Sequence, residues 1–419
     1  MIKKRTYGAH QPPAPNLGGG RVFFFPTFRH NCHMNILQEI FSDHYEAFLD
    51  KYHPRDTIVE NIEKMVHCGD PSRGGAVYGC PDCGEIKFVP FRCHSRFCPT
   101  CGNKYVLERC TAMSFKLVNC VHRHCVFTIP QQLRIFFLKD RSLLNCLFDA
   151  VNSVLFLMFK RLNKKEDFTP GFICVLHTFG RSLQWNPHIH CVVSEGATGL
   201  HTAWRKVDHF NYTFLRKAFM TALLNKLHER IGDSFKATKG YIYRYCQEGF
   251  YIYAKPKKCD PKTVSAYIGR YLGRPVIATS RIDRYDDGKW VTFHYNRHED
   301  DVLVTEVLPV MDFMKRLCQH IPEKHFKMIR YYGIYARHRV EDKDFIKAIP
   351  SEKRNYYRSL LKWRYAILNA FDIDPLKCPR CQGEMIFIEL RYKHQRISLE
   401  DLYYELMDGQ WPNHFDASG

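Results

Sequence analysis

The sequence predicts an α+β fold in which helices pack against an antiparallel sheet. Two apolar segments, residues 171–180 ("GFICVLHTFG") and 187–196 ("PHIHCVVSEG"), flank the short polar segment "RSLQWN" and are typical of a β-hairpin. Helices are predicted on either side of it, a largely apolar one over residues 140–163 and an amphipathic one over residues 210–232. Strands and helices in this order indicate an antiparallel sheet with helices against it.

The N-terminal part is predicted to be helical and to lead into a cysteine-rich segment. The first 25 or so residues are rich in proline and glycine and indicate a flexible lead. Helices are predicted over residues 34–52 and 54–68, where apolar residues recur at roughly helical spacing. The cysteine-rich segment follows at residues 68–101.

The remaining predicted elements lie between residue 122 and the C-terminus. Strands are predicted over residues 122–130, 249–256, 275–282 and 289–296, the last two around a "DDG" turn. A helix is predicted over residues 260–275, with Asp260 as its N-cap, Pro261 at its first position and Pro275 at its end. A separate helical segment is predicted from about residue 336.

The charge of the chain indicates a polyanionic partner. The sequence has 62 lysine and arginine residues against 43 aspartate and glutamate residues, a net charge of +19. Such an excess favours nucleic acid first and an acidic membrane second. No run of about 18 apolar residues is present, so we expect no membrane-spanning helix. The basic N-terminus has no apolar signal core, so we expect a cytoplasmic, nucleoid-associated protein without a membrane partner.

Four of the eighteen cysteines form two Cys-x-x-Cys pairs that predict a zinc site. "CPDCG" and "CPTCG" supply the ligand candidates Cys80, Cys83, Cys98 and Cys101, and fourteen residues separate the two pairs. This spacing is close to that of tetrahedral four-cysteine zinc sites, and soft thiolates select zinc over magnesium or calcium. In a basic, apparently cytosolic chain, metal binding explains such pairs better than disulfides.

Other cysteines leave alternatives open. Cys68 and Cys93 lie close to the two pairs, as do His67 and His94, and these four residues either complete a second zinc site or simply pack. A third pair, Cys378 and Cys381 in "CPRCQGEM", is half a zinc site. Either a distant pair completes it, or it is a vestige.

His188 and His190 are candidate ligands of a second kind of metal. Residues i and i+2 of a strand project from the same face, so both imidazoles can grip one ion while Ile189 faces the core. Two histidines alone rarely hold a metal ion in a protein, so a third protein ligand is expected. His177 on the neighbouring strand is the first candidate and Gln184 the second. His122 and His124 form another His-x-His pair, which shows that such pairs also arise by chance.

Tyr267 and Tyr271 are candidate nucleophiles. They are i and i+4 in the helix predicted over residues 260–275 and therefore share one of its faces. Phenols at this spacing often pack in a core, but Arg270, Arg274 and Arg281 lie among or after them, and guanidinium groups interleaved with hydroxyls suit a phosphate-lined groove. A metal ion beside two tyrosine hydroxyls can support cleavage of a DNA strand, with the cut end held covalently on tyrosine.

The order of these motifs resembles a known family. Zinc knuckles, then "PHIH", then "YIGRYLGRPVIATSRI" resembles the rolling-circle transposases of the insertion-sequence-ninety-one type, which carry a two-tyrosine HUH nuclease domain. The resemblance extends through "GFYIYAKP", "HFKMIRYYGIYARHR" and "CPRCQGEM", and so spans about residues 60–385. One departure is Phe97 in "CHSRFCPTC", where the family pattern has histidine.

The resemblance implies a fold, a reaction and partners. It implies an HUH nuclease core over residues 120–335, in which the His pair binds Mg²⁺ or Mn²⁺ and the tyrosines form 5′-phosphotyrosine links with single-stranded DNA of the element ends and target. A helical, zinc-binding and DNA-binding domain would cover residues 26–119 and a helical segment with a CxxC knuckle residues 336–419. No nucleotide-binding P-loop occurs, so strand separation would come from host helicase or replication proteins.

Three rival functions are weighed against this interpretation. A relaxase or rolling-circle replication initiator would share the His pair and a tyrosine but would not predict the zinc module. A non-enzymatic, zinc-dependent DNA-binding regulator explains the charge and the knuckles but leaves the His and Tyr pairs idle. An RNA-binding protein is compatible with the charge, but no RNA-recognition motif of the aromatic strand type is present.

Overall fold

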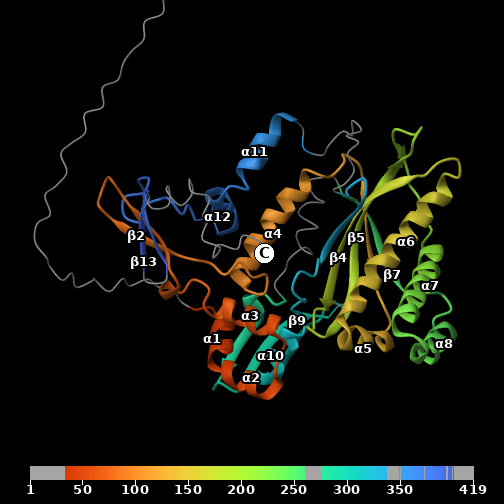
Figure 1. Cartoon of the computed structure of the whole chain (residues 1–419), viewed down its shortest axis with the longest axis horizontal. Helices are drawn as coiled ribbons and strands as arrows, with labels where there is room; N and C mark the ends of the chain where they lie inside the picture. The colour runs from red at the N-terminus through yellow and green to blue at the C-terminus, as the bar shows by residue number, and fades with distance from the viewer. Residues whose placement is uncertain are drawn as a thin grey trace, which may run out of the picture. The chain divides into compact units, whose positions relative to one another are not determined.

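The fold is a mixed α+β architecture with antiparallel sheets, as the sequence predicts. The computed structural model describes residues 34–259, 276–297, 299–336, 349, 351–371, 373–392, 395–398 and 400. Within these residues the strands form three sheets, and all of their pairings are antiparallel (Figure 1). Short 3₁₀ helices occupy Pro71–Arg73, Arg141–Leu143, Asp233–Phe235, Thr279–Arg281 and Ser351–Lys353.

The largest sheet has six strands and includes the predicted hairpin. Its order is β11 (Ile329–Gly333), β4 (Thr169–Phe179), β5 (Trp185–Thr198), β3 (His122–Phe127) and β7 (Ile252–Cys259), and the short β6 (Arg205–Lys206) also pairs with β5. β4 and β5 are the hairpin partners, and β3 pairs with the other edge of β5. β5 is therefore hydrogen-bonded on both sides, which fixes its register.

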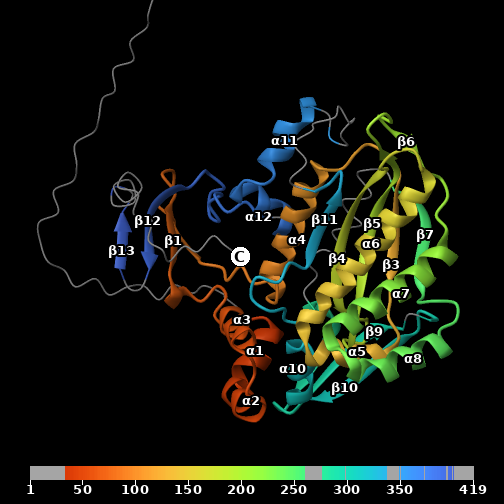
Figure 2. The same cartoon turned by 45° about the vertical axis from the view of Figure 1, so that its right-hand side comes forward.

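Helices cover one face of this sheet. They are α5 (Gln131–Lys139), α6 (Leu144–Leu162), α7 (Tyr212–Ile231) and α8 (Lys236–Tyr245), and Figure 2 shows α6 and α7 lying along the strands. Alternate residues of the strands, such as Cys174, Ile189 and Cys191, join the helices in the main hydrophobic core. The residues between them along each strand point to the opposite face of the sheet.

α6 confirms the largely apolar helix predicted over residues 140–163. The segment Arg141–Leu162 is long and apolar enough to cross a membrane by length and composition. Its apolar side chains, Leu147, Val151, Leu155 and Phe159 among them, are instead buried in the core beneath the sheet. Such burial is what the core helix of a globular domain requires.

The opposite face of the sheet is covered at one end by α4 (Pro99–Ser114). Met113 at the end of this helix, with Leu117 and Val118 just beyond it, packs on Ile173, Val175 and Val192 of the sheet. These sheet residues are the ones that face away from the main core, because they alternate with Cys174 and Cys191 along β4 and β5.

The N-terminal helices share a second core with a three-stranded sheet. These helices are α1 (Ile36–Asp43), α2 (Tyr45–Tyr52) and α3 (Asp56–Val66). They pack with β8 (Ile282–Asp286), β9 (Trp290–Asn296), β10 (Leu303–Pro309) and α10 (Val310–Cys318). The helical stretch predicted over residues 34–52 is confirmed, but His44 divides it into α1 and α2. The strand predicted over residues 275–282 is wrong: within the described residues a 3₁₀ turn occupies Thr279–Arg281 and the strand begins at Ile282.

The third sheet pairs strands that are far apart in the sequence. Its order is β13 (Gln395–Ser398), β12 (Ile386–Tyr392), β1 (Gly75–Gly79) and β2 (Ile86–Pro90), so a C-terminal strand pairs with an N-terminal one. The C-terminal segment also contains α11 (Arg354–Ser359) and α12 (Trp363–Phe371). The prediction of a separate, helical C-terminal segment is therefore wrong in its described part, because β12 completes a sheet of the N-terminal part.

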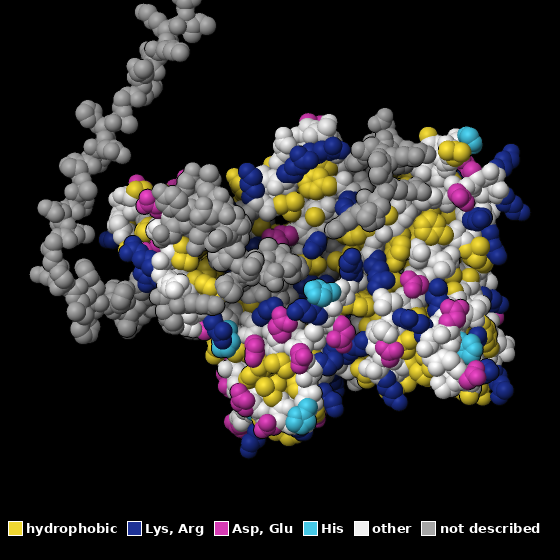
Figure 3. Space-filling view, in the orientation of Figure 1, with side chains coloured by type: hydrophobic (Ala, Val, Ile, Leu, Met, Phe, Trp, Pro, Cys, Tyr) yellow, Lys and Arg dark blue, Asp and Glu magenta, His cyan; other side chains and the backbone are white. Residues whose placement is uncertain are grey.

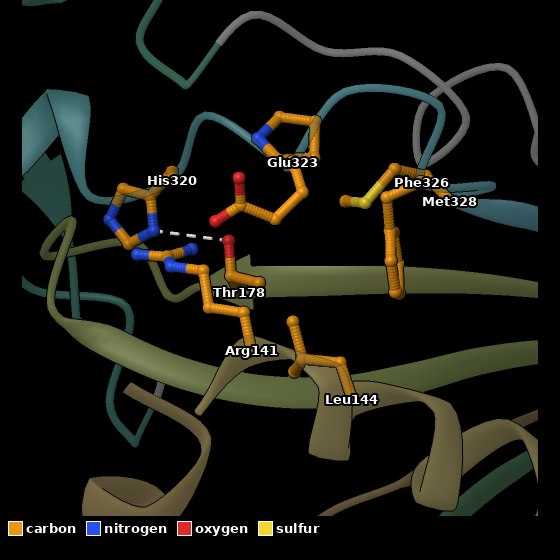
Figure 4. A pocket seen from close by; sticks show the side chains of 8 residues that line it. Arg141, Leu144, Thr178, His320, Glu323, Phe326 and Met328 are labelled. Carbon is orange, nitrogen blue, oxygen red and sulfur yellow. Dashed lines mark hydrogen bonds between the residues drawn. The ribbon is translucent and has the colours of Figure 1, made fainter. Parts of the chain in front are cut away.

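His320 is buried at the end of β4, in a small recess that Arg141, Leu144 and Glu323 help to line (Figure 4). Its Nε2 lies 2.9 Å from the carbonyl of Leu183, which can only accept, so Nε2 carries the proton. Its Nδ1 then accepts from the hydroxyl of Thr178 at 3.1 Å, so the neutral ring is fully bonded. Burial is the main cause that lowers the pKa of His320 to about 3.

We expect His320 to weaken the fold in acid. Its ordinary pKa is about 6.5, so between about pH 6.5 and 3 the unfolded chain binds a proton that the folded chain refuses, and stability falls as pH falls. His320→Gln keeps a donor for the Leu183 carbonyl but does not titrate. The free energy of unfolding of the native protein should therefore fall more steeply than that of the variant between pH 7 and 4.5, by up to about 1.4 kcal/mol per pH unit, and its melting temperature should fall more steeply as well. Parallel melting curves in thermal unfolding would contradict this assignment.

Candidate active site and metal-binding clusters

Three histidines converge on the face of the large sheet that points away from the main core. His188 and His190 project from β5, and His177 of β4 stands directly across from His188 in the hairpin register. One ring nitrogen of each lies within 4.8 Å of the others. The register shifts between His177 and Phe179, and such bulges re-aim side chains next to functional sites.

The hydrogen bonds of the trio bring its ring nitrogens close together and fix the tautomer of His188. Nδ1 of His188 lies 2.7 Å from the carbonyl of Asn186 and therefore donates its proton there. Nε2 of His188 is left with a bare lone pair, 3.0 Å from Nε2 of His190. A backbone carbonyl that fixes the tautomer of one ring nitrogen is the usual way of preparing the other nitrogen to bind a metal.

Burial keeps the imidazoles of His188 and His190 neutral. Burial is the main cause that lowers the pKa of His188 to about 4. Burial also holds the pKa of His190 well below its usual range, and the neighbouring His177, His188 and His124 lower it further. Neutral imidazoles are the ones that bind metals, so His188 and His190 are ready to act as ligands near neutral pH.

The donor set fits a divalent transition metal. Three imidazole nitrogens form the cluster, and no carboxylate among the described residues joins them. Magnesium prefers oxygen ligands, whereas imidazole suits borderline metals, so these residues fit Mn²⁺ better than Mg²⁺. The structure brings His177, the first candidate for the third ligand, to the pair; Gln184, the second, is exposed in the hairpin loop.

The predicted nucleophiles lie outside the described residues. This holds for Tyr267 and Tyr271, and equally for Arg270 and Arg274. The chain enters their segment from β7, which pairs with β3, the neighbour of the histidine strand. After the segment, Ile277 is buried in the second core.

Arg281, the third predicted DNA-binding arginine, is described and makes structural contacts. Its Nε donates to the carbonyl of His294 at 2.9 Å, and its guanidinium donates to the carbonyl of Arg181 at 2.7 Å. These bonds connect the 3₁₀ turn before β8 with β9 and with the loop that follows β4. Sequence reasoning missed this bridging role.

One four-cysteine cluster lies at the start of α4. Cys98 is the N-cap of α4 and Cys101 lies in its first turn, where the helix dipole favours negative charge. Cys68 and Cys93 complete the cluster, and the sulfur of Cys101 lies 3.6 Å from each of theirs. The cluster packs against the second core.

The other cluster joins two knuckles from opposite ends of the chain. The sulfur of Cys80 lies 3.4 Å from that of Cys381, and the sulfur of Cys83 lies 3.6 Å from that of Cys378. We refer to Cys80, Cys83, Cys378 and Cys381 as the clasp. It sits at the ends of β1 and β2 and just before β12, beside the sheet that joins these strands.

The two knuckles of the clasp have the same turn. In the first, Cys80 N–H donates to the carbonyl of Glu85, and Gly84 N–H donates to that of Cys80. In the second, Cys378 and Gln382 repeat both bonds at equivalent positions. Gly84 and Gln382 share a positive φ, which is unusual for glutamine and indicates that the turn is imposed by the site.

Both clusters have the dimensions of zinc sites. The sulfur separations of 3.4 to 3.6 Å are far longer than a disulfide bond. They are close to the ~3.8 Å between thiolates that a tetrahedral site with Zn–S bonds of about 2.3 Å requires. Shared hydrogen bonds lower the pKa of Cys68 and raise that of Cys93, so without a cation the thiolate charge stays on part of the cluster.

The predicted grouping of the cysteines is wrong. Cys80 and Cys83 were expected to share one site with Cys98 and Cys101, but the structure places the two pairs in different clusters. A signal for the true pairing is present in the sequence, since "CPDCGEI" and "CPRCQGEM" both combine a knuckle with a following strand. Spacing in the sequence favours the nearer pair, Cys98 and Cys101. The pairing of β12 with β1 instead brings the distant pair, Cys378 and Cys381, to the first knuckle.

Neither histidine candidate joins a cysteine cluster. His94 is exposed in a turn with positive φ, and His67 lies 3.5 Å from the carboxylate of Asp70. Phe97, the departure from the family pattern, is buried and packs edge-on against Phe41 at 5.6 Å between ring centroids. At this position the chain has core packing rather than a ligand.

Comparisons with known proteins agree with this architecture. Residues 40–129 match the family described as "Transposase zinc-binding domain", and residues 171–343 match the family described as "Putative transposase". The transposase for insertion sequence element IS801 of Pseudomonas savastanoi pv. phaseolicola is 30% identical over 356 residues, which cover 80% of this chain and 84% of that protein. The "Putative transposase y4qJ" of Sinorhizobium fredii is 26% identical over 84% of this chain and 94% of that protein. No solved structure matches the chain.

We expect two tightly bound zinc ions per chain, one for each four-cysteine cluster. In Cys378→Ser/Cys381→Ser the clasp loses two thiolates, so elemental analysis of purified protein should find about one zinc, because the cluster at α4 is intact. Cys246→Ser, which changes a cysteine outside both clusters, should retain two. Two zinc ions in the clasp variant would show that the clasp is not a zinc site.

Proposed function

Because the chain belongs to the transposase family of the insertion-sequence-ninety-one (IS91) type, with its zinc-binding domain, we propose that it nicks and rejoins single-stranded DNA at the ends of its element. The joining would proceed through 5′-phosphotyrosine intermediates on Tyr267 and Tyr271. The observation that carries this proposal is the histidine trio, three imidazoles gathered on the sheet face that points away from the main core. A purely DNA-binding regulator has no use for such a set of ligands.

The histidines would hold the metal of the reaction. His177, His188 and His190 are the residues that would bind it, and Mn²⁺ or Mg²⁺ there would polarise the scissile phosphodiester and offset its developing charge. The side chains contribute a rigid frame: two come from alternate positions of β5, and the third from across the hairpin. A pre-set geometry of this kind reduces the reorganisation needed when substrate binds.

The tyrosines would carry the covalent chemistry. The hydroxyl oxygen of one tyrosine attacks the phosphorus, a new O–P bond forms, and the bond from phosphorus to the 3′ oxygen breaks. The phenolic proton leaves to solvent, and the departing oxygen takes up a proton to become a free 3′ hydroxyl. The reverse attack by a 3′ hydroxyl of another strand end restores the phosphodiester and the tyrosine, so no external energy source is needed.

Two tyrosines explain how a second cut can be made while the first end is still held. In the predicted helix, Tyr267 and Tyr271 share one face and so approach the same metal. One forms the link at the first element end, and the other remains free for the second. This is the reason that we assign both residues as nucleophiles.

The basic charge would supply contacts to the DNA backbone. The chain carries a net charge of +19, and Figure 3 shows lysine and arginine side chains gathered over α11, which contributes Arg354 and Arg358. Arg270 and Arg274 would add contacts near the tyrosines. We place the protein in the cytoplasm, on the nucleoid, where host helicase or replication proteins would expose single strands. Affinity for DNA should therefore fall steeply with salt.

The first test is covalent trapping. End-labelled single-stranded DNA from the element ends is mixed with the protein and Mn²⁺ and run on a denaturing gel. We expect a labelled band at the protein's mass that disappears in Tyr267→Phe/Tyr271→Phe, because phenylalanine has no hydroxyl to form the bond. Tyr241→Phe/Tyr245→Phe is the matched control, a pair with the same spacing on the exposed face of α8.

The outcomes separate the alternatives. An adduct that survives the double substitution at 267 and 271 would make these tyrosines packing residues. DNA binding without any adduct, with each element-derived strand and metal, would favour the DNA-binding regulator.

The second test concerns the metal. We expect His188→Ala to abolish cleavage at all Mn²⁺ and Mg²⁺ concentrations while DNA binding is retained, because one of two adjacent ligands is lost. His209→Ala, which changes an exposed histidine, should leave cleavage unchanged. Cleavage by His188→Ala at high Mn²⁺ would remove His188 from the metal site.

A further inference from the structure

The second His-x-His pair of the chain lies beside the histidine trio. β3 pairs with β5, and in this register Val126 stands opposite His190 while His124 stands opposite Val192. His124 is therefore the diagonal neighbour of His190 on the same face of the sheet, within reach of a long side chain. Its Nε2 lies 3.0 Å from Nδ1 of His190.

The geometry of this contact is that of a hydrogen bond in the plane of both rings. The two imidazole planes differ by 8°, and their centroids are 5.2 Å apart. This separation nearly equals the 3.0 Å between the nitrogens plus the radii of two five-membered rings, so the rings lie edge to edge rather than face to face. An in-plane lone pair of one ring therefore points at the in-plane N–H of the other.

The direction of the hydrogen bond depends on His188. The Asn186 carbonyl holds the proton of His188 on Nδ1, so Nε2 of His188 has a bare lone pair that faces Nε2 of His190. If Nε2 of His190 is also to bind a cation, its proton must sit on Nδ1. Nδ1 then donates to Nε2 of His124, which accepts.

We propose that His124 is a positioning residue for the metal centre: it accepts the Nδ1 proton of His190 and thereby holds that ring in the tautomer and orientation that bind the ion. This inference rests on the proposed function of the trio. Metal-binding histidines commonly donate their second nitrogen to such a partner, which fixes the ring and raises its basicity.

The fold makes His124 a rigid acceptor. Its side chain is 5% exposed, and its strand is paired on both sides, by β5 and by β7. The ligand atoms that lie mutually within 4.8 Å belong to His177, His188 and His190, so His124 stands behind the centre and acts through His190. It is therefore neither a ligand nor a catalytic residue.

His122 provides a matched control on the same strand and the same face. It is as buried as His124, but its Nε2 lies 2.6 Å from the hydroxyl of Tyr335, whose oxygen also accepts from the N–H of Val118. This contact stands at the opposite end of the strand from His190. Substitution of His122 removes a buried imidazole without touching the metal centre.

The test is the affinity for Mn²⁺ alone, measured on the full chain with its zinc sites loaded, from the electron paramagnetic resonance signal of free Mn²⁺. His124→Leu should bind Mn²⁺ about 10- to 100-fold more weakly than the native protein, the usual effect of losing such a partner. His124→Gln should retain most of the affinity, because its amide oxygen can take the place of Nε2 as the acceptor. His124→Asn is polar but too short to reach His190 and should resemble His124→Leu, and His122→Leu should be unchanged.

The results separate the positioning role of His124 from the existence of the metal centre. Native affinity in His124→Leu or His124→Asn would overturn the positioning role, and so would an equal loss in His124→Gln, which would show that only packing matters. His188→Ala is the arm that tests the proposed function: it should abolish Mn²⁺ binding. If it does so while the His124 variants bind normally, the metal centre stands and the inference about His124 falls; if His188→Ala binds like the native protein, the metal centre itself falls.

Discussion

The pairing of β5 on both edges is the constraint on which the site depends. Side chains alternate between the two faces of a strand, so a slip of one residue would exchange His188 and His190 with Ile189 and Cys191. The main core needs the apolar set on its side, and two ladders hold β5 in that register. Burial of the core therefore also fixes the direction in which the imidazoles point, and no additional interaction is required to bring the ligands together.

α4 connects this sheet to the zinc-binding part of the chain. Cys98 of the first cysteine cluster is the N-cap of the helix, and Met113 near its end packs on the sheet face that carries the histidines. A zinc ion that fixes the first turn of a helix fixes its axis, because the helix is stiff over its length. The cluster thus bears on the placement of the sheet as well as on its own surroundings.

Local patterns were readable in the sequence, and long-range pairings were not. The hairpin of β4 and β5, the His pair and the third candidate His177 follow from side-chain alternation, which is a local property. The partners of Cys378 and Cys381 depend on β12 adding to β1, across some three hundred residues, and no spacing rule covers that distance. The sequence likewise gives no sign of a role for His124. Its contact with His190 depends on the register between β3 and β5, which cannot be derived from a single sequence.

The clasp can close only late in the synthesis of the chain. Cys83 and Cys378 are 295 residues apart, so at ~5–20 residues per second the first knuckle leaves the ribosome roughly 15–60 s before its partner. During that interval β1 lacks β12, and the first knuckle offers only two of its four thiolates. A chain cut short before residue 378 keeps the histidines and both tyrosines but cannot close this cluster. Completion of the clasp therefore distinguishes a finished protein from a truncated one that still carries every residue of its proposed chemistry.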